Sequence, residues 1–465
     1  MNVNIKGFGV NTVDGPISLQ ELGKRYEKDF ASPIVAAIVD GSLRELTYVV
    51  DGDSNVEFLD MSSEIGMKIY IRSLIFLFVK ACYDVFPDCK VHVEHSLGDG
   101  LYCEVVRKEP LSEDDVESIE KRMRQLVERD IPIQKYKMPL KEAIAMFKES
   151  GMEDKVRVLK YRKSDFINIY EIDGTKDYFY GYLVPSTGYL KWFGLKFYLP
   201  GIILQHPNKS NPTHIAEYHE QPKLASIFRE SDRWAHILGV PDVGALNELI
   251  TSGKSGEIIR VAEALHEKKI AQIADTIANE KERLRIILIA GPSSSGKTTF
   301  AQRLIVQLRV NGLRPISISL DDYFLDRDKT PLGDDGKPDF EALEAIDLRL
   351  FNQQLAQLIQ GKEVIVPRYN FHTGKREYPD IPTKIEKDQP IIIEGIHGLN
   401  ERLTASIPKE NKFKIYVSAL TQLGIDNHNR ISTTDTRLLR RLVRDSWQRS
   451  TDAKTTISVW PKVLK

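Results

Sequence analysis

Three consecutive segments over residues 284–310 constrain the fold more than any other part of this sequence. Residues 284–290 (LRIILIA) form a short apolar run rich in β-branched side chains, which is typical of a buried parallel strand. Residues 299–310 carry apolar side chains at helical spacing, and the loop before them reads GPSSSGKT, which fits the pattern G-x-x-x-x-G-K-[ST]. A strand, a glycine-containing loop and a helix in this order predict an α/β fold built on a parallel sheet.

The loop has the composition of a site for the phosphates of a nucleoside triphosphate. Glycines let the chain turn without a Cβ clash, and the loop amides and the helix N-terminus point at anionic oxygens. Lys297 would neutralise charge on the β- and γ-phosphates, and the Thr298 hydroxyl would bind Mg²⁺. The alternative is a structural glycine turn. We expect ATP and Mg²⁺ as cofactors, with ATP held by Gly291, Pro292, Ser293, Ser294, Ser295, Gly296, Lys297, Thr298 and Thr299.

Bulk composition limits the classes of protein that this chain can belong to. A length of 465 residues exceeds what one core normally covers, so we expect two or three domains. The 65 Lys and Arg residues balance 66 Asp and Glu residues, so no overall basic field argues for nucleic acid. Cys82, Cys89 and Cys103 lack CxxC spacing, which suits a reduced cytosol and excludes a disulfide framework or a zinc knuckle.

Neither a targeting signal nor a membrane span is expected. The N-terminus has no basic segment followed by an apolar core. The most apolar stretch, residues 69–83, contains Arg72 and Lys80 and is too short to cross a bilayer. We therefore expect a soluble, cytoplasmic protein with no membrane partner.

Local periodicity divides the first 283 residues into three stretches. Residues 1–60 indicate a small α+β module, with strands over 3–5, 35–39, 43–50 and 56–59 and a capped helix over 18–28. Residues 61–221 indicate a second α+β module, with helices over 64–85, 112–129 and 139–150 and strands over 90–94, 101–106, 156–160 and 167–172. Residues 222–283, rich in Glu, Lys and Ala, predict a helical connector or, alternatively, an independent interaction helix.

Residues 284–465 form the fourth stretch, in which strands and helices alternate. This order predicts a parallel sheet with helices on both faces, as in P-loop NTPases. The expected strands are 284–290, 315–320, 363–366, 390–395 and 413–418, and the expected helices are 298–311, 347–360 and 434–449.

Two carboxylates follow strands of this predicted sheet, where the functional groups of such sheets gather. Asp321 follows the strand 315–320, where it could accept the proton of an attacking alcohol or help to hold Mg²⁺. Glu394 ends the strand 390–395, which suits a second carboxylate near Mg²⁺. The alternative for Asp321 is an aspartate in a turn that caps the next segment. The alternative for Glu394 is a glutamate that caps a helix or forms an ion pair.

A helix rich in arginine is expected near the end of the chain. Arg437, Arg441 and Arg444 fall on one helical face, and Arg449 follows. Such a run is often a solvated, salt-bridged helix. Next to a phosphate loop, a row of guanidinium groups that closes over the γ-phosphate is the better interpretation.

Five segments of the last stretch resemble the uridine kinase and phosphoribulokinase family. They are GPSSSGKTT, LDDYF, PRYNF, IIIEG and DTRLLRRLVRD, in the family's order and spacing over about 284–465. The resemblance implies ATP-dependent phosphorylation of the 5′-hydroxyl of a nucleoside, uridine or cytidine, and self-association into a homo-oligomer. It implies that Asp321 is the catalytic base and that Thr298 and Glu394 share Mg²⁺. It also implies that Phe324 and Tyr369 line the nucleoside pocket, and that Glu341 occupies the place of an aspartate that holds ribose hydroxyls.

The segment that should select the acceptor departs from the family pattern. The family's D-H-P reads Glu-Ala-Leu over 341–343, a base-contacting histidine falls on Gly374, with His372 two positions away, and a second lid arginine falls on Thr451. The chain also ends at Lys465, earlier than we expect from the family. Two alternatives therefore stay open: a kinase of a sugar phosphate or another small alcohol, and an ATP-gated RNA-binding protein with vestigial catalysis.

The first 220 residues are similar to the N-terminal region of threonyl-tRNA synthetases. The similar segments are AIVDG (37–41), VEFL (56–59), FP (86–87), GDGLY (98–102) and VPSTG (184–188). The resemblance implies a ubiquitin-like TGS domain over 1–60 and an editing-type domain over 61–221. Editing domains of this type use an HxxxH pair with a later cysteine and histidine, and those four places hold Arg72, Phe76, Phe179 and Leu183.

None of these four residues can activate water or bind a metal. We therefore expect a fold retained without hydrolytic editing, as a regulatory or RNA-contacting module. His92 and His95 are expected to be ordinary strand-end residues. The basic clusters 121–124 and 135–141 could contact phosphate backbones, or could be solvated charges.

Overall fold

The computed structural model describes residues 1–333, 336–386, 389–405, 407–420, 423–448 and 451–464. The chain divides into two compact units, which we describe separately. Unit 1 comprises Met1–Ser255 and Gln422–Ile431, and unit 2 comprises Gly256–Thr421 and Ser432–Lys465. Within the described ranges, each helix is too short or too polar to span a membrane. The predicted boundaries at residues 60, 221 and 283 stay a prediction.

The first 60 residues form a five-stranded sheet with the order β2-β1-β7-β4-β5. Its strands are β1 (Asn2–Ile5), β2 (Gly9–Thr12), β4 (Ile34–Val39), β5 (Ser42–Glu45) and β7 (Ser54–Asp60), and β3 (Ile17–Ser18) pairs separately with β6 (Val49–Val50). Ser18 caps α1 (Leu19–Lys24) as predicted, because its side chain accepts the Glu21 amide. The helix ends four residues earlier than predicted, where apolar positions give way to KRYEKD.

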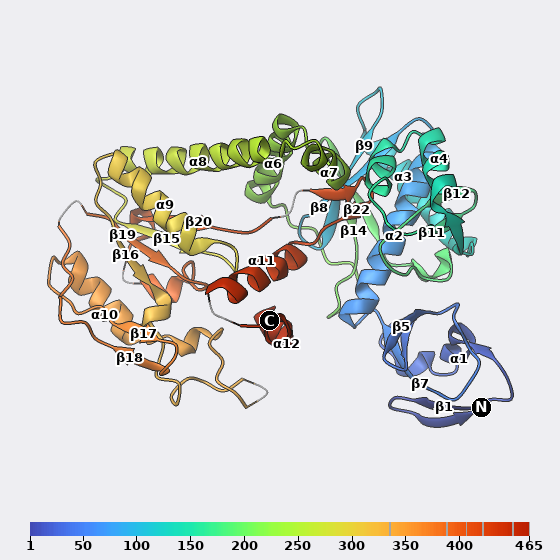
Figure 1. Ribbon diagram of the computed structural model, residues 1–465, viewed down its shortest axis with the longest axis horizontal. Helices are drawn as coiled ribbons and strands as arrows, with labels where there is room; N and C mark the ends of the chain where they lie inside the picture. Colours follow the sequence, from blue (N-terminus) through green and yellow to red (C-terminus); the bar gives the residue numbers. More distant parts are fainter. Residues whose placement is uncertain (334–335, 387–388, 406, 421–422, 449–450, 465) are drawn as a thin grey trace. The chain divides into compact units, whose positions relative to one another are not determined.

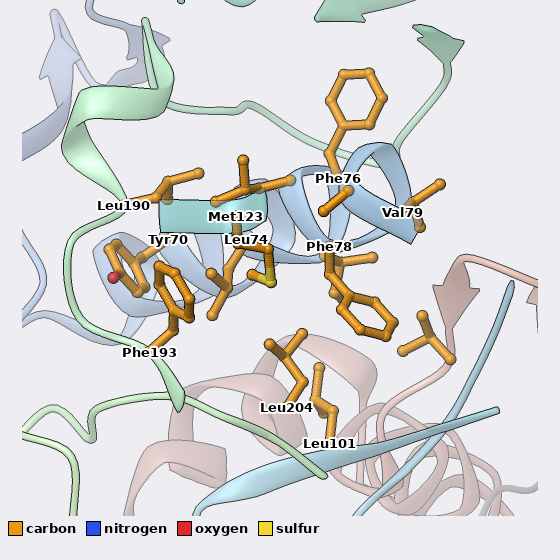
Figure 2. Packing of buried hydrophobic residues seen from close by; sticks show 14 of the residues in the cluster. Tyr70, Leu74, Phe76, Phe78, Val79, Leu101, Met123, Leu190, Phe193 and Leu204 are labelled. Carbon is orange, nitrogen blue, oxygen red and sulfur yellow. The ribbon is translucent and has the colours of Figure 1, made fainter. Parts of the chain in front are cut away.

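The second part of unit 1 is built around α2 (Glu64–Val85), which matches its predicted bounds. This helix is apolar on nearly every face and is correspondingly buried. Figure 2 shows Leu74 and Phe78 of α2 with Leu101, Met123 and Leu204. These neighbours come from β9 (Gly100–Val106), α3 (Glu113–Glu128) and β14 (Gly201–Gln205).

Two sheets complete this part of unit 1. One has the order β13-β14-β9-β8 and includes β8 (Lys90–Ser96) and β13 (Gly194–Tyr198), and the other has the order β10-β11-β12, with β10 (Gln134–Pro139), β11 (Phe166–Ile172) and β12 (Thr175–Asp177). The predicted strands at 90–94, 101–106 and 167–172 are confirmed, as is the helix α4 (Leu140–Glu149). Strands β10, β12, β13 and β14 were not predicted.

The predicted strand at 156–160 is wrong, because these residues belong to helix α5 (Glu153–Leu159). Glu153 and Asp154 lie in its first turn, where negative charge stabilises a helix. The decisive residue is Lys155, whose fully buried ammonium pairs with Asp177 of β12. A partner so distant in sequence leaves no local periodic signal.

Three helices occupy residues 222–279, as the helical periodicity predicted. They are α6 (Pro222–Leu238), α7 (Val243–Thr251) and α8 (Ser255–Asn279). Helices α6 and α7 belong to unit 1, whereas α8 belongs to unit 2 from Gly256 onward.

Unit 2 contains the predicted parallel sheet, with the strand order β16-β19-β15-β20 (Figure 1). The strands are β15 (Ile286–Ala290), β16 (Ile316–Ser319), β19 (Ile391–Glu394) and β20 (Lys412–Tyr416). Alternate strand residues face opposite sides. One face packs against α10 (Leu348–Ile359), and the other packs against α9 (Lys297–Val310) and the C-terminal half of α8.

The predicted strand at 363–366 is wrong. Its only strand-like feature in the described chain is an isolated bridge between Val364 and Thr383. Pro367 follows directly and lacks an amide hydrogen, so the segment cannot extend a ladder there. Nearby, β17 (Arg368–Asn370) and β18 (Lys375–Glu377) form a two-stranded ribbon.

The last described residues form two helices, α11 (Thr433–Gln448) and α12 (Ala453–Val463). The first is the predicted arginine helix, whereas α12 was not predicted. Between β20 and α11 the chain forms a short hairpin of β21 (Gly424–Asp426) and β22 (Asn429–Arg430), which belongs to unit 1.

Candidate functional site

The glycine loop connects β15 to α9 at the carboxyl end of the sheet. A Cβ at Gly291 would lie 2.0 Å from the Val417 carbonyl oxygen, so a larger residue would displace the neighbouring backbone. Gly296 caps α9 with a φ of 102°, a conformation that glycine adopts without strain. Both glycines of the pattern are therefore required by the geometry of the loop.

Several polar groups of the loop are available to an anionic ligand. The hydroxyls of Ser294 and Ser295 are buried and have no protein hydrogen-bond partner among the described residues. The first amides of α9 lack partners within the helix. Lys297 Nζ lies 3.4 Å from the Pro292 carbonyl, at the base of the loop. These donors fit the phosphate oxygens of ATP.

Lys297 also lies in the field of three carboxylates. Burial lowers the pKa of Lys297, whereas Glu394, Asp321 and Glu341 raise it. The ammonium is therefore surrounded by negative charge from three other segments of unit 2. Such a cation would be shared between phosphate oxygens and the acidic groups around them.

Glu394, at the end of β19, contacts two hydroxyls. Thr298 Oγ1 and Ser319 Oγ each donate to Glu394 Oε1 over 3.3 Å. Burial raises the pKa of Glu394, and Asp321 raises it further, while Lys297 opposes them. The predicted pair of Thr298 and Glu394 is thus brought together.

The Thr298 hydroxyl and the Glu394 carboxylate fit a Mg²⁺ ion that keeps water and phosphate ligands. In the described part of the chain, no three His, Cys, Asp or Glu side chains form a ready metal cluster. Mg²⁺ usually binds one or two protein carboxylates together with substrate phosphates and water, so a full protein cage is not required. Thr298, Asp321 and Glu394 stay the predicted ligand set.

Two consecutive aspartates follow β16, and the structure distinguishes them. Asp322 accepts the Tyr369 amide over 3.2 Å, and burial raises its pKa. Asp321 is exposed, and its charge acts on Lys297 and Glu394. Asp322 therefore holds the local backbone, while Asp321 is presented beside the phosphate loop.

Glu341 lies in the same electrostatic field. Burial raises its pKa, Arg441 lowers it, and the neighbouring charge of Asp321 raises it again. The carbonyl oxygen of Glu341 lies 2.9 Å from His397 Nε2, which fixes the backbone. The residue predicted to hold ribose hydroxyls is thus near the predicted base.

Arginines of α11 contact the glycine loop directly. Arg437 Nε donates to the Ser293 carbonyl over 3.2 Å, and Arg441 Nη1 donates to the Ser293 hydroxyl over 3.2 Å. Arg440 Nε donates to the Ser294 carbonyl over 3.0 Å. Arg440 was missed, although its spacing of three from Arg437 places both on neighbouring positions of one helical face.

Arg444 was predicted to face the phosphate loop with Arg437 and Arg441, but its side chain pairs with Asp445. Its Nη2 donates to Asp445 over 2.7 Å, and Arg441 Nε lies 3.3 Å from the same carboxylate. Arg449 lies outside the described residues. The structure therefore brings Arg437 and Arg441 to the loop, with Arg444 one ion pair away.

The helix α12 supports this row of arginines. The Arg437 guanidinium lies 5.3 Å from the centroid of the Trp460 ring, and Thr456 Oγ1 donates to Asp445 over 3.4 Å. Sequence reasoning missed this helix. Its signals were the cap Asp452, whose side chain accepts the Thr455 amide, and the four-residue spacing of Thr456 and Trp460.

The two aromatic residues predicted to line a nucleoside pocket pack against each other. The rings of Phe324 and Tyr369 lie 5.7 Å apart, and only 4% and 7% of these residues is exposed. Phe371 packs 5.0 Å from Tyr369 and is 55% exposed. Phe324 and Tyr369 thus form the floor of an aromatic cluster whose accessible member is Phe371.

In unit 1, the residues at the four positions of an editing site also lie in one region of the core. These residues are Arg72, Phe76, Phe179 and Leu183. The rings of Phe76 and Phe179 lie 5.2 Å apart, and Leu183 is buried in the same core. Arg72 Nη1 donates to the neighbouring Tyr182 carbonyl over 3.0 Å, and burial lowers the pKa of this guanidinium. Apolar side chains therefore fill the place where catalytic groups would meet.

The two histidines of β8 differ in their surroundings. His95 is buried and stacks on Phe228 with centroids 3.5 Å apart, and burial lowers its pKa to about 3. His92 Nδ1 lies 3.6 Å from Glu94, and this contact raises its pKa. His95 is thus a neutral packing residue at neutral pH, and it lies near the end of β8, where an ordinary strand-end residue was predicted.

Comparison with known families decides the identity of the C-terminal part. Residues 286–464 match the model of the Phosphoribulokinase / Uridine kinase family. These residues form a domain of that family. The match covers all the predicted phosphate-site residues, so the domain is that of a P-loop kinase.

The N-terminal part is similar to threonine–tRNA ligases. It is 29% identical over 195 residues to the ligase of Azoarcus sp. (strain BH72). The matched region covers 42% of this chain and 31% of that protein. It is 33% identical over 178 residues to the ligase of Fusobacterium nucleatum, which covers 38% of this chain and 29% of that protein. The matched region thus spans about a third of the length of these relatives.

Solved structures also resemble this chain. One is described as "a Possible Uridine Kinase from Bacillus stearothermophilus", with 22% identity, 31% of this chain and 78% of that chain covered, and a TM-score of 0.26. Another is a D-glycerate 3-kinase from Cryptococcus neoformans, with 17% identity, 43% and 67% covered, and a TM-score of 0.23.

Within the Phosphoribulokinase / Uridine kinase domain, an arginine occupies space beside the position of the missing histidine. A Cβ at Gly374 would lie 2.8 Å from Arg327 Nε. Arg327 Nη2 donates to the Phe371 carbonyl over 2.7 Å, which holds the guanidinium over this turn. Sequence reasoning missed Arg327, because nothing in its local pattern indicates that it packs against Gly374.

Proposed function

We propose that the kinase domain transfers the γ-phosphoryl group of ATP to the 5′-hydroxyl of a nucleoside, uridine or cytidine. The observation that carries this proposal is the joint field of Lys297, Asp321 and Glu394 at the carboxyl ends of the strands. A cation for phosphate, a presented carboxylate and a hydroxyl–carboxylate pair are the parts that phosphoryl transfer needs.

Each residue has a defined role in this proposal. Bound ATP would supply the phosphoryl group, and Mg²⁺ would neutralise charge on its oxygens. Lys297 and the loop amides bind the β- and γ-phosphate oxygens. Asp321 orients the acceptor hydroxyl and takes its proton as the new O–P bond forms. Arg437 and Arg441 stabilise the charge on the migrating group, because their guanidinium groups already lie against the loop.

The proposed acceptor is supported by the aromatic cluster. Phe371 offers an accessible ring for stacking, and Phe324 and Tyr369 support it from below. Glu341 lies near Asp321 and could accept hydrogen bonds from ribose hydroxyls. A base, a sugar and a reacting hydroxyl would then each have a partner in unit 2.

One observation favours a second candidate, the kinase of a sugar phosphate. Arg327 is exposed and lies beside Gly374, near the aromatic cluster. A guanidinium binds an acceptor phosphate well and a neutral base less well. RNA contact by the N-terminal part, a cytoplasmic location and self-association stay predictions.

Measurement of ADP release from purified protein tests both candidates. The acceptors are uridine, cytidine, other nucleosides and phosphorylated pentoses, each with ATP and Mg²⁺. Saturable turnover with uridine or cytidine supports the first candidate, and turnover restricted to phosphorylated pentoses supports the second. Absence of turnover with every acceptor would contradict kinase activity on either class.

Asp321→Asn tests the role of the base in the same assay. We expect kcat to fall by about 10³-fold or more while ATP binding changes little, because the carboxylate acts on the acceptor proton. Asp328→Asn is the matched control, since Asp328 is exposed in the same loop region. Full activity of Asp321→Asn would remove Asp321 from the mechanism.

A further inference from the structure

A hairpin encoded within the kinase part of the sequence belongs to unit 1. Strands β21 and β22 pair through Gly424 with Arg430 and Asp426 with Asn429. Before them, β20 belongs to the sheet of unit 2, and after them α11 contacts the glycine loop of unit 2. The chain therefore leaves the kinase fold for one short element and returns at the start of the arginine helix.

Buried charge holds the hairpin in unit 1. Lys155 Nζ lies 2.8 Å from Asp177 Oδ1 and 3.0 Å from Asp426 Oδ1, and 0–1% of each of these side chains is exposed. His428 Nδ1 lies 2.6 Å from the second Asp177 oxygen, Oδ2. One ammonium from α5 thus joins a carboxylate of β12 to a carboxylate of the hairpin, and separation would leave buried charges without compensation.

The positive charge of Lys155 is stabilised by the negative charges of Asp177 and Asp426. Burial would lower the pKa of Lys155, but attraction by Asp177 and Asp426 raises it above the usual value. Asn429 Nδ2 also donates to both Asp426 oxygens, over 3.0 and 2.9 Å, and to the Tyr178 carbonyl over 3.1 Å. The hairpin contributes Asp426, His428 and Asn429, and all three are buried.

Hydrogen bonds from the backbone and from the Arg430 side chain hold the hairpin β21–β22 against β8, at the edge of its sheet. Strand β8 is the last strand of its sheet, and the Val93 amide donates to the Asn427 carbonyl over 2.8 Å. Arg430 donates to the Glu94 carbonyl over 2.6 Å and to the Ser96 hydroxyl over 3.0 Å. Exposed edges readily accept another strand, so the hairpin satisfies polar groups that β8 would otherwise leave open.

The chain that links this hairpin to α11 is short. Arg430 is followed by Ile431 and Ser432, and α11 begins at Thr433. Three residues span at most about 11 Å when fully extended, so a seated hairpin restricts where α11 can begin. Arg437, the first loop-contacting arginine, lies one helical turn further on.

We propose that seating of the hairpin 423–431 on unit 1 holds the start of the arginine helix and thereby controls kinase turnover. The synthetase-like unit would then act as a regulatory support of the kinase, through a segment of the kinase's own sequence. The kinetic part of this inference rests on the proposed function, whereas the structural part does not.

Hydrogen exchange of the full chain tests the structural part. Lys155→Met removes the shared ammonium, and we expect at least tenfold faster amide exchange in 423–431 and also in 433–448. Lys163→Met is the matched control, because Lys163 is exposed, and it should change neither segment. Faster exchange in the hairpin alone would overturn the coupling, and unchanged exchange in both would overturn the seating itself.

A milder variant covers the case in which loss of buried charge unfolds unit 1. Arg430→Ala removes only the contacts to Glu94 and Ser96, and Arg162→Ala is its exposed control. We expect a threefold or greater increase in exchange over 433–448 for Arg430→Ala and none for the control. Folding is checked by the unchanged exchange of α2.

Turnover of the same variants tests the kinetic part. Arg430→Ala should lower kcat by at least threefold while the KM for ATP changes by less than twofold, because the loop itself is intact. If wild-type protein phosphorylates no acceptor, the proposed function fails, but the exchange results still decide the coupling. If the wild type is active and Arg430→Ala retains full kcat with faster exchange over 433–448, the control of turnover is refuted.

Discussion

The phosphate loop of unit 2 differs from the positions of unit 1 that correspond to an editing site. The loop keeps polar groups for a ligand, whereas the editing-site positions are filled by apolar side chains. At the loop, buried hydroxyls of Ser294 and Ser295 have no partner among the described residues, and Lys297 lies in a field of carboxylates. At the editing-type place, the rings of Phe76 and Phe179 pack in an apolar core. A ligand site keeps polar groups that the fold does not satisfy, whereas a lost site is filled with apolar side chains that stabilise the fold.

The largest expected effect would sharpen this contrast on the side of unit 2. Arg441→Ala should lower kcat by about 10³-fold, because its guanidinium stabilises charge that develops on the migrating phosphoryl group. The thermal midpoint should change by only a few degrees. Steady-state ADP release and thermal unfolding measure the two quantities.

Arg349→Ala is the matched control for this variant, because Arg349 is exposed on a different helix of unit 2. It should leave kcat unchanged. A loss of less than tenfold in Arg441→Ala would show that the contact with Ser293 is only structural, and the contrast with unit 1 would then break.

The opposite pattern is expected for the filled place in unit 1. Phe76→Ala removes a fully buried ring, and we expect a loss of about 3–5 kcal/mol in the free energy of unfolding. Urea unfolding followed by the fluorescence of Trp192, which contacts this core, measures it. Kinase activity under conditions where both units are folded should stay within severalfold of wild type.

Phe166→Ala is the control, because 53% of Phe166 is exposed. It should cost less than about 1 kcal/mol, as surface substitutions usually do. Equal losses for the two phenylalanines would mean that the ring of Phe76 does not stabilise the core, and that the place is not filled in the sense argued above.

Elements with a local signal could be predicted from the sequence, and elements held by distant partners could not. The helix at 64–85 and the glycine loop were confirmed because apolar spacing and a short motif define them locally. The predicted strand at 156–160 was wrong: these residues belong to helix α5, whose Lys155 pairs with Asp177 and Asp426 from other parts of the sequence. The hairpin 423–431 was missed for the same reason.

Within the candidate site, the sequence predicted which residue types converge but not how they divide the work. The structure brings Thr298 and Glu394 within hydrogen-bond distance of each other, and their shared Mg²⁺ stays a prediction. The sequence could not show that Arg440 contacts the loop while Arg444 pairs with Asp445, because both lie on the same face. Side-chain reach and competing partners decide such assignments, and neither is visible in spacing.

The smallest expected effect concerns a half-buried carboxylate of unit 1, Asp232, which has no role in the proposed phosphoryl transfer. Burial, with Glu94 and Glu104 nearby, raises the pKa of Asp232 from 3.8 to about 7. A raised folded-state pKa contributes stability that is fully present below about pH 4, where the unfolded carboxyl is also protonated, and is lost as the pH rises toward 7. The thermal midpoint of unit 1 should therefore fall by a few degrees between pH 5 and pH 8. Asp232→Asn should flatten this slope, whereas Asp14→Asn, at an exposed position, should keep it. An equal slope in Asp232→Asn would assign the pH dependence of unit 1 to other groups.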